Sequence, residues 1–293
     1  WQRDGDEFLN AIRSGNDGEL CTHGVSHAGE TAFPRTFQAL QDGGVLTYFG
    51  ASSGYYMTFM GKPGSAAPSE MLRRTGVTPG QSAVIFYGHT DGQRDTDALA
   101  AIEAARASSL RIVVITDTDS QRDFVLSLGY GDAVAGAASL EEIKRREPLF
   151  DWPDTMPELP APESENFKEA VRMMNENTLK PIGRAIGKWL RSADNPVGQP
   201  DIIVERAHRD SLFASVMMVK PHTGVVLYSG DMEGRRYSFY APQVWMRQRS
   251  ILMPTASILG THLCNAAEVV KLNRMISSGA VKVPEPYLGD WDE

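Results

Sequence analysis

Short apolar runs alternate with amphipathic stretches through the middle of the chain. Residues 83–87 (AVIFY) and 111–116 (RIVVIT) are continuous apolar runs with the length of buried parallel strands. The spacing of apolar residues predicts helices over 95–107 and 119–128, and a third short strand follows at 132–135. Strands and helices that alternate with short loops are typical of a doubly wound parallel sheet. The pattern therefore predicts an α/β fold.

The flanking regions carry further elements of the same kind. Before residue 76, strands are expected at 19–25 and 44–49, with a helix over 30–41 between them. Residues 147–163 hold five prolines and predict a linker or an excursion over the surface. One long helix or two should follow over 165–191, with a break at Pro181-Ile182-Gly183. Later strand and helix patterns, an apolar segment and an amphipathic helix are expected at 201–205, 210–219, 224–229, 236–240, 242–258 and 262–277.

Two stretches of the chain resemble each other at a shift of 180 residues. When residues 30–59 are laid over residues 210–239, Phe33 meets Phe213, Tyr48 meets Tyr228 and Phe59 meets Phe239. Glycines at strand ends also coincide by chance in unrelated parallel strands, but the run of matches favours a duplication. A period this long indicates two domains rather than a solenoid.

The expected fold class is therefore α/β with tandem Rossmann-like parallel sheets. The first unit is represented only by its C-terminal portion, at 1–62, and a connection follows at 63–75. The second, degenerate unit is complete at 76–258, and 259–293 forms a C-terminal helix and tail that lead back to a catalytic domain. The chain opens with Trp rather than Met, and we expect it to be part of a longer polypeptide.

Composition and charge narrow the classes of molecule that the protein is expected to bind. The net charge of −8 argues against a nucleic-acid partner, because such binding depends on phosphate neutralisation. No apolar run reaches the length of a membrane span, and no signal-peptide pattern is present. Cys21 and Cys264 lack metal-ligand spacing; a disulfide is possible, but two thiols in a reducing cytoplasm is the favoured interpretation. We expect a cytoplasmic protein with no metal site.

Candidate chemistry lies at the carboxyl ends of the first two expected strands, where open α/β sheets bind ligands. His27 follows the strand at 19–25, and Glu30 lies one helical turn further on. The strand at 44–49 runs into a loop of small residues, Gly50, Ala51, Ser52, Ser53 and Gly54. Small side chains let a flat ring approach the backbone, and the hydroxyls of Ser52 and Ser53 can bind a carboxamide. The alternative is a Gly/Ser turn beside a surface histidine.

The corresponding edge of the second unit looks unsuited to phosphate. Its loop at 88–93 keeps two glycines instead of the three of a dinucleotide fingerprint, and Asp91 lies where phosphate should bind. We expect this unit to be structural. Near the end of the chain, Thr261 and His262 open the last helix, where Thr261 caps the helix or lines a substrate site.

Three segments carry a family resemblance: "SHAGETAFP" at 26–34, "GGVLTYFGASSG" at 43–54 and "VWMRQRSILMPTASILGTHL" at 244–263. They resemble the medium-chain dehydrogenase/reductase superfamily, in its zinc-independent enoyl-CoA reductase branch with crotonyl-CoA carboxylase/reductase. The resemblance implies that His27 is the active-site histidine and that residues 50–54 form the nicotinamide-side loop. Thr261 and His262 then match a Gly-Ser-His-Phe motif, with Thr in place of Ser. The family's GroES-like catalytic domain and the glycine fingerprint of the first unit have no counterpart in the chain.

The resemblance implies NADPH as cofactor, a short-chain enoyl-CoA as substrate, other domains of the same polypeptide as partners, and a homo-oligomer. Two alternatives stay open at this point. One is a non-catalytic scaffold of tandem Rossmann-like units that mediates oligomerisation. The other is a quinone or alcohol reductase of the same superfamily.

Overall fold

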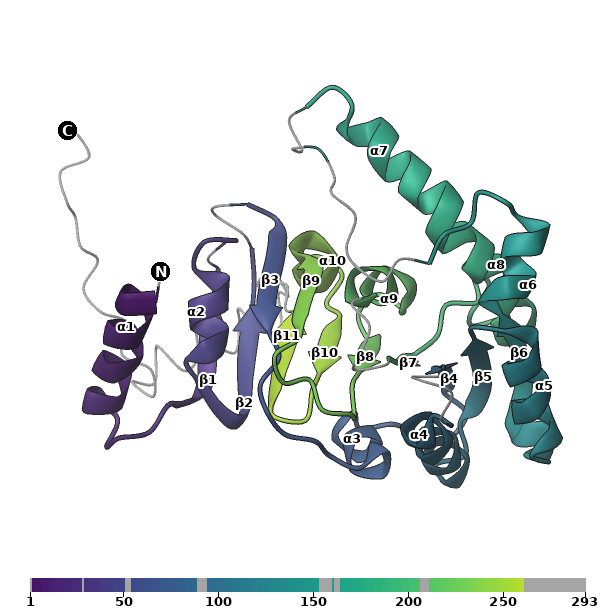
Figure 1. The fold of residues 1–293 in the computed structure, drawn as a ribbon, viewed down its shortest axis with the longest axis horizontal. Coiled ribbons are helices and arrows are strands. Elements are labelled where there is room, and N and C mark those ends of the chain that lie inside the picture. Colours follow the sequence, from purple (N-terminus) through teal and green to yellow (C-terminus); the bar gives the residue numbers. More distant parts are fainter. Residues whose placement is uncertain are drawn as a thin grey trace. The chain divides into compact units, whose positions relative to one another are not determined.

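The fold is built on one nine-stranded sheet in the order β1-β2-β11-β10-β8-β7-β4-β5-β6 (Figure 1). The computed structural model describes residues 2–27, 29–50, 54–88, 94–152, 160, 164–205 and 211–260. The strands of the sheet are β1 (Cys21–Ser26), β2 (Leu40–Tyr48), β4 (Ser82–Tyr87), β5 (Arg111–Thr116), β6 (Val134–Ser139), β7 (Ile202–Val204), β8 (Val225–Leu227), β10 (Ser250–Leu252) and β11 (Ala256–Gly260). A separate antiparallel ribbon pairs β3 (Tyr56–Met60) with β9 (Arg236–Tyr240).

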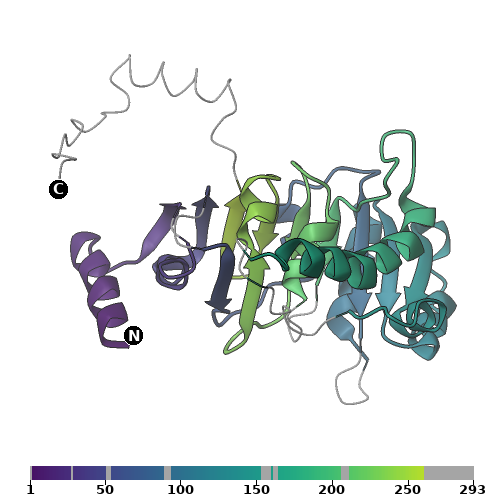
Figure 2. The ribbon, with the colours of Figure 1, turned by 90° about the horizontal axis from the view of Figure 1, so that it is seen from above.

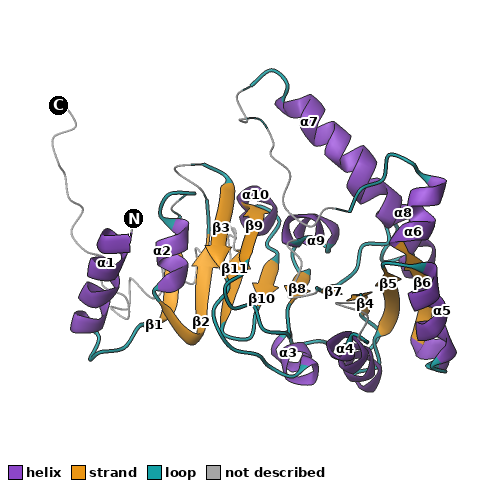
Figure 3. Cartoon of the chain, viewed as in Figure 1, coloured by secondary structure: helices purple, strands orange, loops and turns teal. Residues whose placement is uncertain are grey.

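Helices connect the strands (Figure 3). They are α1 (Gln2–Gly15), α2 (Phe33–Gln38), α3 (Pro68–Arg74), α4 (Thr96–Ala107), α5 (Asp119–Ser127), α6 (Leu140–Arg146), α7 (Phe167–Met174), α8 (Lys180–Leu190), α9 (Leu212–Met218) and α10 (Ala241–Trp245). Several of them begin at side-chain caps. The side chain of Asp95 caps α4, and Thr118 with Gln121 forms a capping box at the start of α5.

Six of the strands reproduce the order of a dinucleotide-binding sheet. In β6-β5-β4-β7-β8-β10 every neighbouring pair is parallel. Numbered by their order along the chain, these strands lie in the spatial order 3-2-1-4-5-6. β11 then runs antiparallel to β10 and parallel to β2, so the sheet continues into β2 and β1. Figure 2 shows the purple, yellow-green and blue strands following one another in a single row. The predicted α/β class with a large, mostly parallel sheet is confirmed.

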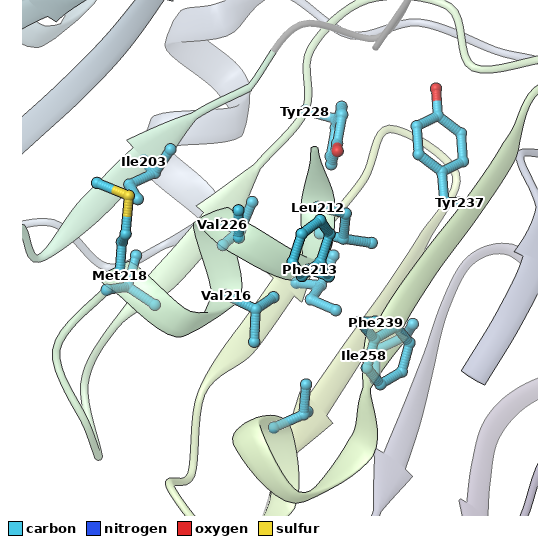
Figure 4. Close-up of a cluster of buried hydrophobic side chains, with 14 of the residues drawn as sticks. Ile203, Leu212, Phe213, Val216, Met218, Val226, Tyr228, Tyr237, Phe239 and Ile258 are labelled. Carbon is cyan, nitrogen blue, oxygen red and sulfur yellow. The ribbon is translucent and has the colours of Figure 1, made fainter. Parts of the chain in front are cut away.

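The sheet separates two apolar cores, one on each face. Successive side chains of a strand point to opposite faces, so β4 contributes to both cores. Ala83, Ile85 and Tyr87 of β4 belong to one core, with α3, α4 and α5. Val84 and Phe86 belong to the other, which also takes in α8, α9 and the β3–β9 ribbon. Figure 4 shows part of the second core, where side chains of α9, β8, β9 and β11 share one interior. Helices on both faces explain the fully apolar strands.

The predicted helix break at Pro181 is wrong. The chain stays helical from α7 through a π-helical turn at Asn175–Leu179 into α8, with Pro181 in the first turn of α8. Proline cannot donate an N–H bond and crowds the carbonyl four residues before it. Here that carbonyl, on Asn177, accepts the backbone N–H of Asp151 at 2.9 Å. An outside donor thus satisfies the group that proline leaves free.

The proline-rich segment at 147–163 begins inside the core rather than on the surface. Phe150 and Trp152 are buried, and the Trp152 ring stacks on Phe86 with a centroid distance of 5.2 Å. Most of the remaining segment, and the expected helix at 262–277, lie outside the described residues. The expected boundary at residue 258 falls within β11, which pairs with both β10 and β2.

A buried carboxylate fastens β4 to β7 at the amino end of the sheet. Asp201 accepts hydrogen bonds from the Ser82 backbone N–H at 2.8 Å, the Ser82 hydroxyl at 2.7 Å and the Lys220 ammonium at 2.7 Å. Burial alone would raise the pKa of Asp201, but the hydrogen bonds from Lys220 and Ser82 outweigh burial and hold the pKa below its usual 3.8. The ionised form is therefore the one that the fold stabilises.

Asp201→Asn should lower the free energy of unfolding at neutral pH by about 2 kcal/mol, because the amide leaves a buried donor without its charged acceptor. A depressed pKa stabilises the fold above the unfolded value and loses that contribution as pH falls through the folded pKa. The difference between wild type and variant should therefore shrink below about pH 4. Urea titrations at several pH values measure it, with the exposed Asp194→Asn as control. A pH-independent difference would contradict the assigned role.

Candidate functional site

The carboxyl ends of β1 and β2 bring the first candidate residues together. β1 ends at Ser26 and β2 at Tyr48; the strands are parallel, so His27 and Gly50 emerge at the same edge of the sheet. The His27 ring is exposed and stacks on Phe49, with ring centroids 5.8 Å apart and an interplanar angle of 14°. A Cβ at Gly50 would lie 3.9 Å from the His27 Cβ, an ordinary contact distance. His27 and Gly50, the first residue of the glycine loop, therefore lie side by side.

Glu30 closes this edge from the side. Its carboxylate accepts the backbone N–H of Tyr56 at 2.8 Å, just beyond the glycine loop. Gly54 has a φ of +122°, and a Cβ there would lie 2.6 Å from the Glu30 Cδ. The conformation favours glycine, and a larger residue would force the Glu30 side chain to move. The described geometry therefore uses Glu30 to hold the end of the loop.

Two tyrosines that the sequence did not mark as site residues, Tyr48 and Tyr56, lie near Glu30. Burial, with the charge of Glu30, raises the pKa of Tyr48 well above its usual value. Burial, with the charges of Tyr240 and Glu30, raises the pKa of Tyr56 to about 12. The Tyr56 hydroxyl is buried without a hydrogen-bond partner among the residues that the structure describes. The aromatic pair directly after the glycine loop, Tyr55-Tyr56, was the available sequence signal.

Tyr56→Phe should leave stability at pH 7 unchanged or slightly raised, because it removes a buried hydroxyl that lacks a partner. In the unfolded chain the hydroxyl ionises near pH 10, whereas in the fold it ionises near 12. A raised folded pKa stabilises the fold fully below the unfolded value, and this contribution is lost as pH rises through the folded pKa. Wild type should therefore lose more stability than the variant between these values, as melting temperatures against pH would show. Parallel curves would count against the assignment.

The corresponding edge of the six-stranded part is occupied by the protein's own carboxylates. Asp95 accepts the backbone N–H of Ala98 at 2.9 Å, in the first turn of α4, and that of Gly88 at 3.2 Å, directly after β4, so both donors are already used. At the end of β7, the buried Glu205 accepts the hydroxyls of Ser211 and Ser215. Phosphate binds helix N-termini through free N–H groups and positive potential. At this edge the carboxylates of Asp95 and Glu205 already occupy hydrogen-bond donors and bring negative charge, so both requirements of a phosphate site are opposed.

A small pocket of about 140 Å³ remains at this second edge, lined by Tyr87, Arg94, Ser120, Gln121 and Phe124. The Arg94 guanidinium lies over the Phe124 ring at 4.8 Å from its centroid. The arginine thus has an aromatic partner within the fold.

The remaining predicted site residues, Ala51, Ser52, Ser53, Thr261 and His262, lie outside the described residues. Gly260, directly before Thr261, pairs with Tyr48 at the end of β2. Within the described ranges, no group of three or more His, Cys, Asp or Glu side chains is placed to hold a metal ion. Cys21 is a free thiol. No described helix has the length and apolarity needed to cross a membrane.

Comparisons with known proteins add the following. No protein-family model matches the chain, and no curated protein matches it. Among solved structures, the chain is similar to the crotonyl-CoA carboxylase/reductase AntE in complex with NADP, with 20% identity and a TM-score of 0.46 over 74% of this chain and 47% of that one.

Two further solved structures show the same kind of likeness. The 2-octenoyl-CoA carboxylase reductase CinF, in complex with NADP and 2-octenoyl-CoA, shares 19% identity at a TM-score of 0.41, over 73% of this chain and 40% of that one. The quinone oxidoreductase from Thermus thermophilus shares 15% identity at a TM-score of 0.35, over 72% and 46%. The chain thus spans less than half the length of these proteins. With every TM-score below 0.5, the fold assignment rests on the strand order.

Proposed function

We propose that this chain is the C-terminal part of an NADPH-dependent enoyl-CoA reductase. The observation that carries the proposal is the convergence of His27, Gly50 and Gly54 at the carboxyl edge of two parallel strands, with Glu30 fastening the loop. Ligands of open α/β sheets bind at this edge. The motifs "GETAFP" and "GGVLTYFGASSG", which carry the family resemblance, are the segments that form it.

The described residues fit a flat cofactor ring. Gly50 has a φ of +75° and Gly54 a φ of +122°, so the loop begins and ends in conformations that favour glycine. When bound, NADPH supplies a hydride for the β-carbon of a short enoyl thioester. The loop at residues 50–54 would hold the nicotinamide side, with the hydroxyls of Ser52 and Ser53 available to its carboxamide.

The other candidates take roles that the chain's own groups can perform. His27 would orient or polarise the thioester while a proton reaches its α-carbon, and Thr261 with His262 would shape the substrate pocket. Glu30, whose carboxylate is engaged by the Tyr56 N–H, acts on the loop rather than on a reacting atom. Acryloyl-CoA is the proposed substrate, and the wider protein is proposed to be a multifunctional propionyl-CoA synthase of the cytoplasm.

The proposed organisation keeps a partial first Rossmann-like unit and a complete second one. Asp95 and Glu205 occupy the second edge, which supports a second unit without a nucleotide. One NADPH per chain is the expected stoichiometry.

NADPH-dependent reduction of acryloyl-CoA by the full-length protein tests the proposal, followed through NADPH absorbance. His27→Ala should lower kcat by about 100-fold, the scale of a lost polarising group. The KM for NADPH should change less. His23→Ala, an exposed histidine of β1, is the matched control.

Other outcomes separate the alternatives. Turnover of a quinone or an alcohol but of no enoyl-CoA would replace the proposed substrate class. A full-length protein that binds no NADPH would favour the scaffold.

A further inference from the structure

Two neighbouring parts of the sheet repeat one another element by element. At the shift of 180 residues, β1 corresponds to β7, α2 to α9, β2 to β8 and β3 to β9, whose bounds Tyr56–Met60 and Arg236–Tyr240 match residue for residue. The repeat in the sequence is therefore also present in the structure. The strand pairing then shows whether a two-fold axis relates the two copies.

The β3–β9 ribbon obeys a two-fold exchange. Tyr56 pairs with Tyr240, and the equivalent positions, Arg236 and Met60, also pair. Thr58 pairs with Ser238, its own equivalent, and their hydroxyl oxygens lie 3.2 Å apart. In a two-fold interface, residue i contacts j wherever j contacts i. Thr58 and Ser238 thus mark the axis.

The β10–β11 pair obeys the same exchange. The tripeptide Ser-Ile-Leu occurs at 250–252 in β10 and again at 257–259 in β11. The two copies pair antiparallel, with Ile251 opposite Ile258. Ile251 lies beside Val226 of β8 and Ile258 beside Leu46 of β2, positions that the shift of 180 makes equivalent. β11 is therefore the counterpart of β10 for the first copy.

We infer that the six-stranded part takes the place of a second subunit in a two-fold dimer that is built into one chain. In this arrangement β11 of the first copy pairs with β10 of the second copy within the same chain. One apolar core runs through both copies, with Phe33 and Phe59 on one side and Phe213 and Phe239 on the other.

This built-in partner also supports the candidate site. The Ala241 backbone N–H, at the start of α10, donates to the Tyr55 carbonyl at 2.8 Å. The Tyr240 ring contacts Tyr55 and Tyr56, with centroid distances of 6.0 and 5.4 Å. Tyr56 is the residue whose N–H binds Glu30, so the second copy braces the end of the glycine loop. This role rests on the proposed function, whereas the two-fold arrangement does not.

A designed disulfide tests the arrangement. Thr58→Cys with Ser238→Cys places two thiols on opposed residues of neighbouring strands, within reach of a bond. In the oxidised full-length protein we expect a 58–238 cross-link within one chain, at a yield independent of concentration, mapped by mass spectrometry of a non-reduced digest. The two single-cysteine variants are controls. Covalent dimers joined through these positions, or no 58–238 link, would overturn the inference.

A second pair of variants tests the support of the site. Tyr240→Ala should raise the KM for NADPH about tenfold through a displaced loop. Met60→Ala, at the two-fold equivalent position, should leave it unchanged, because the second copy has no site to brace. Thermal unfolding of both variants reports any global loss. Equal effects of the two variants on the KM for NADPH, or no effect of either, would show that Tyr240 does not support the loop. A protein that forms the 58–238 link but shows no NADPH-dependent reductase activity would refute the proposed function alone.

Discussion

Gly54→Ala should weaken NADPH binding by the full-length protein about 100-fold. At a φ of +122°, a side chain imposes about 2 kcal/mol of backbone strain. The new Cβ would also lie 2.6 Å from the Glu30 Cδ, so the Glu30 carboxylate must shift, and we expect this shift to break its hydrogen bond with the Tyr56 N–H. That lost charge-assisted hydrogen bond adds about 1.5 kcal/mol. We expect about 2.7 kcal/mol of this total to oppose the loop conformation that binds NADPH, which corresponds to a 100-fold loss of affinity.

The matched control is Gly76→Ala. Gly76 also has a positive φ, +67°, but a Cβ there meets no atom within 4 Å. This variant should lose about 1 kcal/mol of stability and no NADPH affinity. Fluorescence titration with NADPH compares the two.

Combining the site variant with Glu30→Ala shows which effect dominates. Removing the Glu30 carboxylate relieves the clash but also removes the anchor. The double variant should therefore bind NADPH about as weakly as Gly54→Ala alone, because that substitution already costs both the backbone strain and the hydrogen bond between Glu30 and Tyr56. Strictly additive losses would show that Gly54 acts independently of Glu30.

The sequence predicts well those elements whose cause is local. The apolar runs of β4 and β5 mark buried strands, and the apolar spacing over 95–107 marks α4, whose cap Asp95 is supplied by the adjoining sequence. Pro181 misleads because its effect depends on Asp151, whose N–H satisfies the carbonyl of Asn177 from a distant segment. A local rule cannot include a donor that only the tertiary fold supplies.

The residues of the candidate site also divide into those placed by the local sequence and those placed by the tertiary fold. Strand ends and small residues locate His27 and Gly50, because both depend on the chain's own strands. The contact between Glu30 and Tyr56 spans 26 residues and depends on the ribbon that turns back over the sheet. Tyr240 reaches the same place from the other copy. Spacing along the chain reveals neither contact.

The assignment of β11 shows why topology needs the structure. Residues 242–258 are expected only as one apolar segment, yet the short turn after β10 moves the chain from one copy to the other. The repeated tripeptide Ser-Ile-Leu is visible in the sequence. The sequence alone does not show whether its two occurrences form one local hairpin or belong to different copies of the repeat.

Ile258→Asp should prevent the protein from folding to a soluble state. Ile258 is fully buried where β11 meets β10, opposite Ile251. Losing its apolar burial costs about 3 kcal/mol, and an uncompensated buried carboxylate adds several more. The sum approaches the whole stability of about 5–15 kcal/mol of a typical protein. The control Val25→Asp, at a position of β1 that is 71% exposed, should stay soluble and change stability by about 0.5 kcal/mol or less.

Milder substitutions make the junction measurable. Ile251→Ala and Ile258→Ala should each lower the free energy of unfolding by about 3 kcal/mol. Because the two side chains oppose each other across the junction, the double variant should differ from the sum of the single losses by about 1 kcal/mol. Denaturant titrations of the four proteins give this coupling directly. If the losses simply add, the two isoleucines do not pack against each other, and the continuous sheet between the two copies loses its central contact.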